Sequence, residues 1–453
     1  MSHHPLIVSM SGMRGVVGDS MTPALALQVG MALATWIRQG SIVVGGDTRT
    51  SHDTLKGALI SGILACGVNV MDVGRVTTPT LQQSILRHHA TLGVMITASH
   101  NPSIWNGLKL MNHEGSFLTQ TEYDAFMACY QRAVWSLASW DAQGALQHDS
   151  HAIESHVTLV LDRIDTSPIR QGRPLSVLVD ANHGAGAVAD PVLLNQLGVS
   201  YTILNPEPTG RFAHDPEPLE KNLDQIKGVM AAGGYDIGFV QDADADRLVI
   251  LDEKGQFIGE DYSLAFCIDH VLQMALQEDP GATHHVVVNL STSQVVADVV
   301  KQYGGTITHT KVGEAHVTEG IRHQKALVGG EGNGGVIYPK IGWGRDSLVG
   351  MVLALRHCAV SGRSVSEIVK GYPSYRMIRH RLALESHDQV ATVLQSVVDA
   401  FPGYPIIRDD GVKVMLDDGW LHARASNTEP IIRVFVEATH EDIAHGYLNR
   451  ICL

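Results

Sequence analysis

The hydrophobic and polar positions of this chain alternate between short apolar runs and segments of helical period. The run "SIVVGGDTR" (41–49) is followed by "TLKGALISGILACG" (54–67), which has apolar residues at helical spacing, and then by "VNVMDVG" (68–74). Short continuous apolar runs between helical segments are typical of parallel strands that helices cover on both faces. The pattern therefore predicts βαβ units.

This unit recurs along the chain. "IVVGGDTR" (from 42), "VLVDANHG" (from 177) and "VVVNLSTS" (from 286) each predict a buried strand that enters a helix. Each is followed by a second strand and loop, in "GVMITASHN" (from 93), "IGFVQDADADR" (from 237) and "ALVGGEGNGG" (from 326). We predict an α/β fold with three related mixed domains, at 1–150, 151–256 and 257–370. Because ligands of open α/β sheets bind beyond the carboxyl ends of the strands, the second set of loops supplies three walls of one site.

The pattern changes after residue 370. A helical segment, "SHDQVATVLQSVVDAF", is followed by strand-like runs around "VKVMLDD", "WLHARAS" and "IIRVFVEA". Helices and antiparallel strands grouped in this way indicate a smaller C-terminal α+β domain at 371–453.

Composition and charge narrow the classes of partner. The 453 residues are 44% hydrophobic and 18% charged, which is typical of a globular protein. A formal charge of −14 opposes nucleic-acid binding, because phosphate contacts need clustered cations. Five scattered cysteines without CxxC spacing indicate free thiols and a cytoplasmic location, and the absence of a long apolar stretch predicts no membrane partner.

Three carboxylates at alternate positions, Asp242, Asp244 and Asp246, stand in "QDADADRL". On a straight strand they would lie about 6.6 Å apart on one face, so joint binding of one Mg²⁺ requires the segment to curl. A solvated acidic turn and an aspartyl nucleophile of a phosphatase at Asp242 remain alternatives. An EF-hand is excluded, since Arg247 stands where that loop needs glycine.

Two further loops carry groups suited to a phosphosugar. "RASNTEPIIRV" (424–434) offers hydroxyl, amide and guanidinium groups for a phosphate dianion, namely Arg424, Ser426, Asn427, Thr428 and Arg433. "VGGEGNGGVIYP" (328–339) places Glu331 and Asn333 among glycines, where they could bind hydroxyls. Taken alone, each loop could also be an ordinary turn.

The stretch "ITASHNPSIWNGLKL" (96–110) sets Ser99 beside His100, with Lys109 ten residues beyond the serine. Adjacent side chains on an extended loop point apart, so we expect no direct Ser-His pair, and the G-x-S-x-G turn of hydrolases is absent. A phosphoryl group on Ser99 would match a metal on the Asp loop and the cations Arg14, Lys109 and Arg247. A turn or helix-capping serine is the alternative.

The ordered set "SGMRG" (11–15), "TASHNP", "DADADR", "GEGNGG" and "RASNTEP" resembles the α-D-phosphohexomutases across essentially the whole chain. The resemblance implies three α/β domains and a fourth domain around a central active-site cleft. It also implies an isomerase that interconverts hexose 6-phosphate and hexose 1-phosphate through phosphoserine at Ser99 and a 1,6-bisphosphate. One Mg²⁺ per chain would be held by Ser99, Asp242, Asp244 and Asp246, and hexose 1,6-bisphosphate would be the activator.

The resemblance also implies roles for the remaining residues. Arg14 and Arg247 would assist transfer, Lys109 would move a proton or stabilise charge, and His100 would orient the loop. The "RASNTEP" loop would bind the phosphate that is not transferred, and Glu331 would bind sugar hydroxyls. The chain would act as a monomer or homodimer.

Several positions depart from familiar members of the family. Ala243 and Ala245 replace glycines, the sugar loop lacks a serine, and Asn427 replaces a frequent glycine. The forms "TKVGEAHV" (310–317) and "GEGNGG" are similar to those of phosphoglucosamine mutases of the archaeal type. They favour glucosamine 6-phosphate as the substrate, with phosphomannomutase or phosphoglucomutase activity as the alternative.

Overall fold

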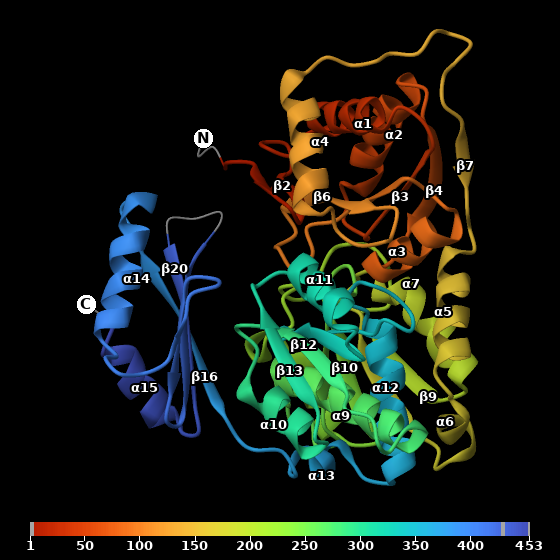
Figure 1. Ribbon diagram of the computed structural model, residues 1–453. Coiled ribbons are helices and arrows are strands. Elements are labelled where there is room, and N and C mark those ends of the chain that lie inside the picture. The colour runs from red at the N-terminus through yellow and green to blue at the C-terminus, as the bar shows by residue number, and fades with distance from the viewer. Residues whose placement is uncertain (1–3, 427–430, 452–453) are drawn as a thin grey trace.

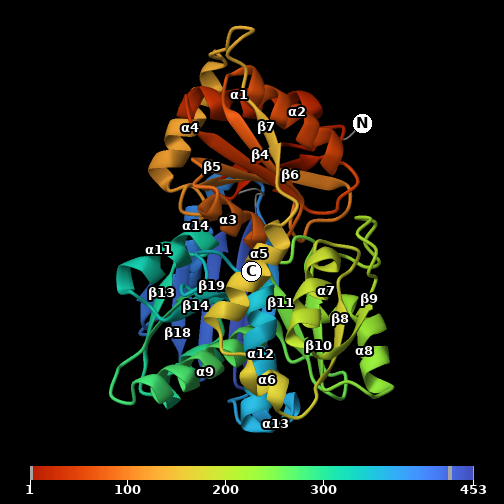
Figure 2. The same ribbon diagram turned by 90° about the vertical axis from the view of Figure 1, so that its right-hand side faces the viewer.

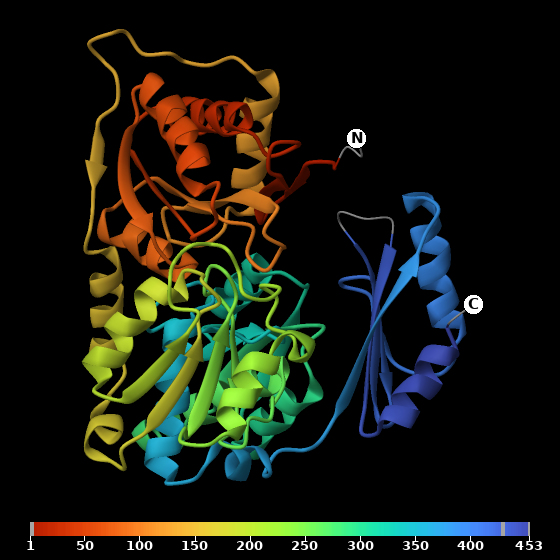
Figure 3. The same cartoon turned by 180° about the vertical axis from the view of Figure 1, so that it is seen from behind.

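The computed structural model describes residues 4–426 and 431–451, which form four sheets flanked by helices (Figure 1). Three sheets lie together with their helices, and the C-terminal sheet stands beside them (Figures 1 and 3). The predicted fold class, three α/β units and a C-terminal α+β unit, is confirmed. Within the described residues, no helix combines the length and apolar character needed to cross a membrane.

The first sheet has the strand order β1-β2-β6-β5-β3-β4-β7. Its strands are β1 (Ile7–Ser9), β2 (Gly12–Val16), β3 (Ser41–Gly46), β4 (Asn69–Arg75), β5 (Leu92–Ile96), β6 (Trp105–Asn112) and β7 (Leu146–His148). Its helices are α1 (Pro23–Ile37), α2 (His52–Ala65), α3 (Thr78–Arg87) and α4 (Gln120–Arg132). The apolar run at 42–44 is fully buried in β3, as expected for a central strand covered on both faces.

The second and third sheets have the orders β11-β10-β8-β9 and β13-β12-β14-β15. The second unit contains α5 (Ala152–Arg163), α6 (Ser167–Gln171), β8 (Ser176–Asp180), α7 (Gly186–Leu197), β9 (Ser200–Leu204), a short 3₁₀ helix (Glu220–Asn222), α8 (Asp224–Ala231), β10 (Ile237–Gln241) and β11 (Leu248–Leu251). The third contains α9 (Glu260–Glu278), β12 (His285–Asn289), α10 (Gln294–Gln302), β13 (Thr306–Thr310), α11 (Glu314–Gln324), β14 (Val328–Glu331), β15 (Gly335–Ile337), α12 (Ser347–Ser361) and α13 (Val365–Val369).

The three sheets repeat one arrangement. A parallel pair (β3 with β5, β8 with β10, β12 with β14) is followed by an antiparallel pair (β5 with β6, β10 with β11, β14 with β15). The turn between the antiparallel strands spans 97–104 in the first sheet, 242–247 in the second and 332–334 in the third. The candidate loops therefore occupy equivalent places in the three sheets.

Helix α12 joins the units at the centre of the molecule, where it lies against α5, α6 and α9 (Figure 2). Asp346 caps its first turn by accepting hydrogen bonds from the amides of Leu348 and Val349, and Gly362 ends it in the left-handed conformation. Asp346 also bonds to Nε2 of His156 on α5 at 2.9 Å. The cap thus ties the helix start to a neighbouring helix.

The C-terminal sheet is antiparallel, with the order β16-β20-β19-β18-β17. Its elements are β16 (Arg376–Ala383), a short 3₁₀ helix (His387–Gln389), α14 (Val390–Asp399), β17 (Ile406–Ile407), β18 (Val412–Leu416), β19 (Gly419–Ala425), β20 (Ile431–Ala438) and α15 (Glu441–Asn449). Helices α14 and α15 pack on one face over an apolar core. The alternate residues of each strand are therefore left on the opposite face.

Buried polar contacts dock the C-terminal sheet on the third unit. Lys413 Nζ donates to the Leu290 carbonyl at 2.7 Å, and the Gln294 amide donates to Glu437 Oε1 at 2.7 Å. The loop at 424–434, which carries the candidate phosphate-binding residues, is called the phosphate-type loop below. These contacts fix its sheet relative to the three loops of the other units.

Candidate active site

A cleft of about 1000 Å³ is lined by residues of all four units. Among the described residues that line it, nine side chains are basic and five are acidic, although the chain as a whole carries −14. The basic residues are Arg14, Lys109, Lys311, Arg247, Arg345, Arg379, Arg381, Arg424 and Arg433. A local excess of cations in a concave site attracts an anionic ligand.

Ser99 lies beside this cleft, in the loop between β5 and β6, next to His100, which lines the cleft. It is buried, and its backbone adopts the left-handed conformation with φ 51°. Its amide donates to Thr97 Oγ1 at 2.8 Å, and its Oγ donates to Asp242 Oδ2 at 2.9 Å. The serine hydroxyl therefore meets the acidic loop that the sequence places 143 residues away.

The expectation that Ser99 and His100 make no direct contact is wrong in part. Ser99 Oγ lies 3.4 Å from His100 Nδ1, because the left-handed backbone at Ser99 replaces the extended one we assumed. Nδ1 accepts a shorter hydrogen bond from Arg247 Nη2 at 2.8 Å, so its lone pair is already engaged. Burial and the nearby Arg247 hold the pKa of His100 well below its usual value. The neutral imidazole positions Arg247, and Arg14 contacts the next residue, donating to Asn101 Oδ1 at 3.2 Å.

Arg49, which sequence reasoning missed, holds the serine loop from behind. Its guanidinium donates to the carbonyls of Ser99 and Asn101 at 2.7 and 2.6 Å and to those of Pro102 and Trp105 at 2.8 and 2.9 Å. Its Nε donates to Asp47 Oδ2 at 3.2 Å, and Thr97 Oγ1 donates to the same oxygen at 2.6 Å. The sequence did contain one indication of this role: Arg49 stands in "GGDTR" (45–49), at the carboxyl end of the buried strand β3, where ligand-binding loops of α/β sheets lie.

The acidic loop curls as joint metal binding requires. Ala245 has φ 54°, and its amide donates to the Asp242 carbonyl at 3.0 Å. The amides of Asp246 and Arg247 both donate to Asp242 Oδ1 at 3.2 Å. One oxygen from each of Asp242, Asp244 and Asp246 lies within 4.8 Å of the others, and all three residues are buried.

The side chains of this loop fit a divalent cation. The Oδ1 atoms of Asp244 and Asp246 are buried and have no hydrogen-bond partner among the described residues. Buried carboxylate oxygens without partners are costly, and carboxylate oxygens are the ligands that Mg²⁺ prefers. The three Asp residues could therefore hold a metal ion beside Ser99.

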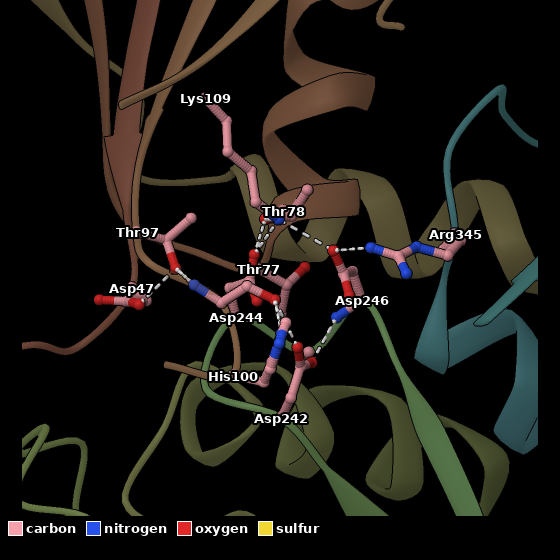
Figure 4. Close-up of polar contacts among 12 residues, drawn as sticks. Asp47, Thr77, Thr78, Thr97, His100, Lys109, Asp242, Asp244, Asp246 and Arg345 are labelled. Atoms are coloured by element: carbon pink, nitrogen blue, oxygen red, sulfur yellow. Dashed lines mark hydrogen bonds and ion pairs between the residues drawn. The ribbon is translucent and has the colours of Figure 1, made fainter. Parts of the chain in front are cut away.

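Lys109 and Arg345 supply the positive charge that faces these carboxylates (Figure 4). Lys109 Nζ lies 2.6 Å from Asp244 Oδ2 and 2.9 Å from Asp246 Oδ2, and Arg345 Nη2 lies 2.8 Å from Asp246 Oδ2. Burial and the two neighbouring carboxylates raise the pKa of Asp242 well above its usual value. Burial acts in the same direction on Asp246, but Arg345 and Lys109 outweigh it and lower the pKa of that carboxyl.

Arg345 also links the acidic loop to the third unit. Its Nη1 donates to Glu331 Oε2 at 3.1 Å and its Nε to Glu314 Oε2 at 2.8 Å. Burial raises the pKa of Glu314 to about 7, against the opposing effect of Arg345. No motif in "GWGRDSL" marked this arginine, since its partners come from three separate segments: the acidic loop, the start of α11 and the end of β14.

The glycine-rich segment 328–339, the candidate sugar-binding loop, presents Glu331 and Asn333 to the cleft. Glu331 Oε1 accepts hydrogen bonds from Asn289 Nδ2 at 2.9 Å and from the Gly313 amide at 3.0 Å. Asn333 Oδ1 is buried and has no partner among the described residues. The carboxylate is thus held in place, while the amide oxygen is available to a ligand.

The phosphate-type loop lies on the C-terminal sheet across the cleft. Arg424 and Arg433 line the cleft, and Arg424 Nε lies 3.0 Å from Asp410 Oδ2. Ser426 is buried, and its amide donates to the Ile431 carbonyl at 2.9 Å. Asn427 and Thr428, the other two predicted residues, lie outside the described part of the chain.

Comparison with known proteins gives the same arrangement of units. Family models described as "Phosphoglucomutase/phosphomannomutase" match in order: alpha/beta/alpha domain I at 6–134, domain II at 154–255, domain III at 259–375 and the C-terminal domain at 378–453. A "Phosphoglucomutase/phosphomannomutase" of Thermococcus kodakarensis is 37% identical over 97% of this chain and 96% of its own length. A "Probable phosphoglucosamine mutase" of Methanopyrus kandleri is 36% identical over 96% and 94%.

A crystal structure of a phosphoglucomutase/phosphomannomutase family protein from Burkholderia thailandensis is similar throughout. It superposes with a TM-score of 0.84 at 25% identity, covering 98% of this chain and 96% of that one.

Proposed function

Since the chain belongs to the phosphoglucomutase/phosphomannomutase family of isomerases, which are intramolecular phosphotransferases, we propose that it interconverts hexose 6-phosphate and hexose 1-phosphate through phosphorylated Ser99. The observation that carries this proposal is the 2.9 Å contact of Ser99 Oγ with Asp242 beside a cleft lined by cations. A serine in this place can carry a phosphoryl group whose charge the surroundings balance.

The reaction transfers a phosphoryl group twice. In the first transfer the bond from phosphorus to Ser99 Oγ breaks and a bond to a sugar hydroxyl oxygen forms. The hydroxyl proton leaves to a base, and Ser99 Oγ takes up a proton to become a hydroxyl again. The resulting bisphosphate turns round, and its other phosphoryl group returns to Ser99. Free hexose 1,6-bisphosphate would prime an unphosphorylated serine as the activator.

Different residues of the chain would position the transferring phosphoryl group and balance its charge. Mg²⁺ held by Asp242, Asp244, Asp246 and a phosphoserine oxygen would neutralise charge on the transferring group. Lys109 reaches this loop with its ammonium group, where it can stabilise charge or exchange a proton with the reacting hydroxyl. Arg14 and Arg247 extend the positive surface around Ser99.

The opposite wall would hold the part of the substrate that does not react. The loop of Arg424 and Ser426, with Asn427, Thr428 and Arg433, would bind the second phosphate. Glu331 and Asn333 would bind sugar hydroxyls. Because the two phosphates exchange places, this wall must accept the sugar in two orientations, and a glycine-rich loop with few side chains suits that requirement.

We propose glucosamine phosphate as the preferred substrate. The forms of the "GEGNGG" and "TKVGEAHV" loops support it, and so does the similarity to the Methanopyrus protein named for that activity. The name of the Thermococcus protein makes glucose and mannose phosphates the substrates to compare.

The test measures mutase kcat/KM with Mg²⁺ and a trace of bisphosphate on the 6-phosphates of glucosamine, glucose and mannose. A preference for glucosamine of about tenfold or more, near 1.4 kcal/mol, supports the substrate proposal. Ser99→Ala should abolish activity and the mass of one bound phosphoryl group, whereas Ser103→Ala, an exposed serine of the same loop, should retain both. Net phosphate release that persists in Ser99→Ala would instead indicate a phosphatase with an Asp nucleophile.

A further inference from the structure

The C-terminal sheet presents a row of three arginines across adjacent strands. Arg381 on β16 is the register partner of Arg433 on β20, which is in turn the partner of Arg424 on β19. Directly opposite residues of antiparallel strands point to the same face, and all three residues line the cleft. Arg424 and Arg433 belong to the wall of the cleft that would bind the second phosphate, called the phosphate wall below. Arg381 extends this wall by one strand, to β16.

A row of like charges directly opposite one another opposes strand pairing unless anions balance it. Asp410 lies against Arg424, 3.0 Å from its Nε. Two residues before Arg381 on the same strand, Arg379 faces Glu260 at 3.0 Å. Arg381 is exposed, and among residues 4–426 and 431–451 it has no hydrogen-bond or ion-pair partner.

This arrangement indicates a ligand with more negative charge than one fixed phosphate. In the function proposed above, on which this inference rests, the bisphosphate must release both sets of phosphate contacts in order to turn round. Hydrogen bonds are lost once their partners separate, but charge attraction still acts over about 8–10 Å at physiological ionic strength. An unpaired arginine on an edge strand can follow a moving phosphate.

We propose that Arg381 is a third cation of the phosphate wall and that it retains the bisphosphate in the cleft while the intermediate reorients. Its contribution falls on the intermediate, which carries two phosphates, more than on the monophosphate substrate. Loss of Arg381 therefore increases escape of bisphosphate into solution and increases the need for added activator.

The experiment compares Arg381→Gln, which removes the charge, with Arg381→Lys, which keeps it. Arg376→Gln is the matched control, because Arg376 is an exposed arginine on the opposite face of the same strand and does not line the cleft. Two quantities are measured for each variant: the bisphosphate concentration that gives half-maximal mutase rate, and the bisphosphate released per turnover after labelling of Ser99.

In Arg381→Gln we expect both quantities to rise by about fivefold or more while kcat at saturating bisphosphate stays within about twofold of the parent. Arg381→Lys should restore most of the loss, and Arg376→Gln should match the parent. Unchanged release and unchanged activator requirement in Arg381→Gln would overturn the inference, as would an equal effect in Arg376→Gln.

Different results would contradict the proposed function and the role proposed for Arg381. If the parent protein lacks mutase activity, or if Ser99→Ala keeps it, the function is wrong whatever Arg381 does. If the parent is active and depends on Ser99, the result for Arg381 tests the retention role alone.

Discussion

Arg49→Lys is expected to loosen the serine loop without removing the positive charge. A guanidinium has five N–H donors, and Arg49 uses all five, on four backbone carbonyls of the loop and on Asp47. An ammonium has three donors and no fork geometry. At least two of these five buried hydrogen bonds are therefore lost.

The magnitude follows from that count. Losing a buried hydrogen bond from a charged donor costs about 1–3 kcal/mol, so losing two of them costs about 2–6 kcal/mol. The lower value corresponds to about a 30-fold increase in the population of the open loop. Because chains with several domains generally do not unfold in one step, the effect is best measured locally.

The assay is amide hydrogen exchange of the segment 97–105, together with mutase activity. In Arg49→Lys, exchange of this segment should accelerate about 30-fold or more, and kcat should fall because Ser99 is no longer held toward Asp242. Arg75→Lys is the control, since Arg75 is an exposed residue of the same unit paired with the exposed Asp53. Exchange within threefold of the parent in Arg49→Lys, with unchanged kcat, would show that Arg49 does not hold the serine loop in place.

Three further changes test the site and the core. Asp242→Asn should abolish saturable Mg²⁺ binding measured by calorimetry, whereas Asp141→Asn, at an exposed position, should leave it intact; equal Mg²⁺ affinity in both would contradict the metal assignment. Lys109→Met should lower kcat by about 10²-fold or more and alter the pH profile, and an unchanged rate and profile would remove Lys109 from the mechanism. Burial raises the pKa of Asp190 to about 8, so its contribution to stability is complete below about pH 4 and is lost as the pH rises to 8. Thermal unfolding should therefore show Asp190→Asn gaining stability relative to the parent by up to about 1.4 kcal/mol per pH unit over that range, and a difference independent of pH would show that Asp190 is ionised in the folded protein.

Much of the fold follows from local pattern. The continuous apolar runs at β3, β8 and β12 have no polar face, so they can be stable only inside a sheet covered on both sides. The recurrence of the unit indicated that the loops after β5, β10 and β14 would occupy equivalent places, and the three antiparallel pairs confirm it. The curl of the Asp loop could also be inferred, because carboxylates on a straight strand are too far apart to share one ion.

The remainder depended on contacts between distant segments. Arg345 joins Asp246, Glu314 and Glu331, and Arg49 joins Asp47 to the serine loop, yet neither residue stands in a motif whose spacing reveals its partners. The contact of Ser99 with His100 was misjudged because the left-handed backbone at Ser99 is imposed by the loop around it.

Hydrophobic period and turn chemistry act over a few residues, so the order of residues was enough to predict which elements form and which side chains stand at the ends of strands. Which charges face one another became clear only from the folded chain. The balance of Lys109 and Arg345 against three carboxylates, and the row of arginines across β16, β20 and β19, arise when strands far apart in the chain take a fixed register. Electrostatic interactions depend on distance in space and on burial, and the order of residues along the chain specifies neither.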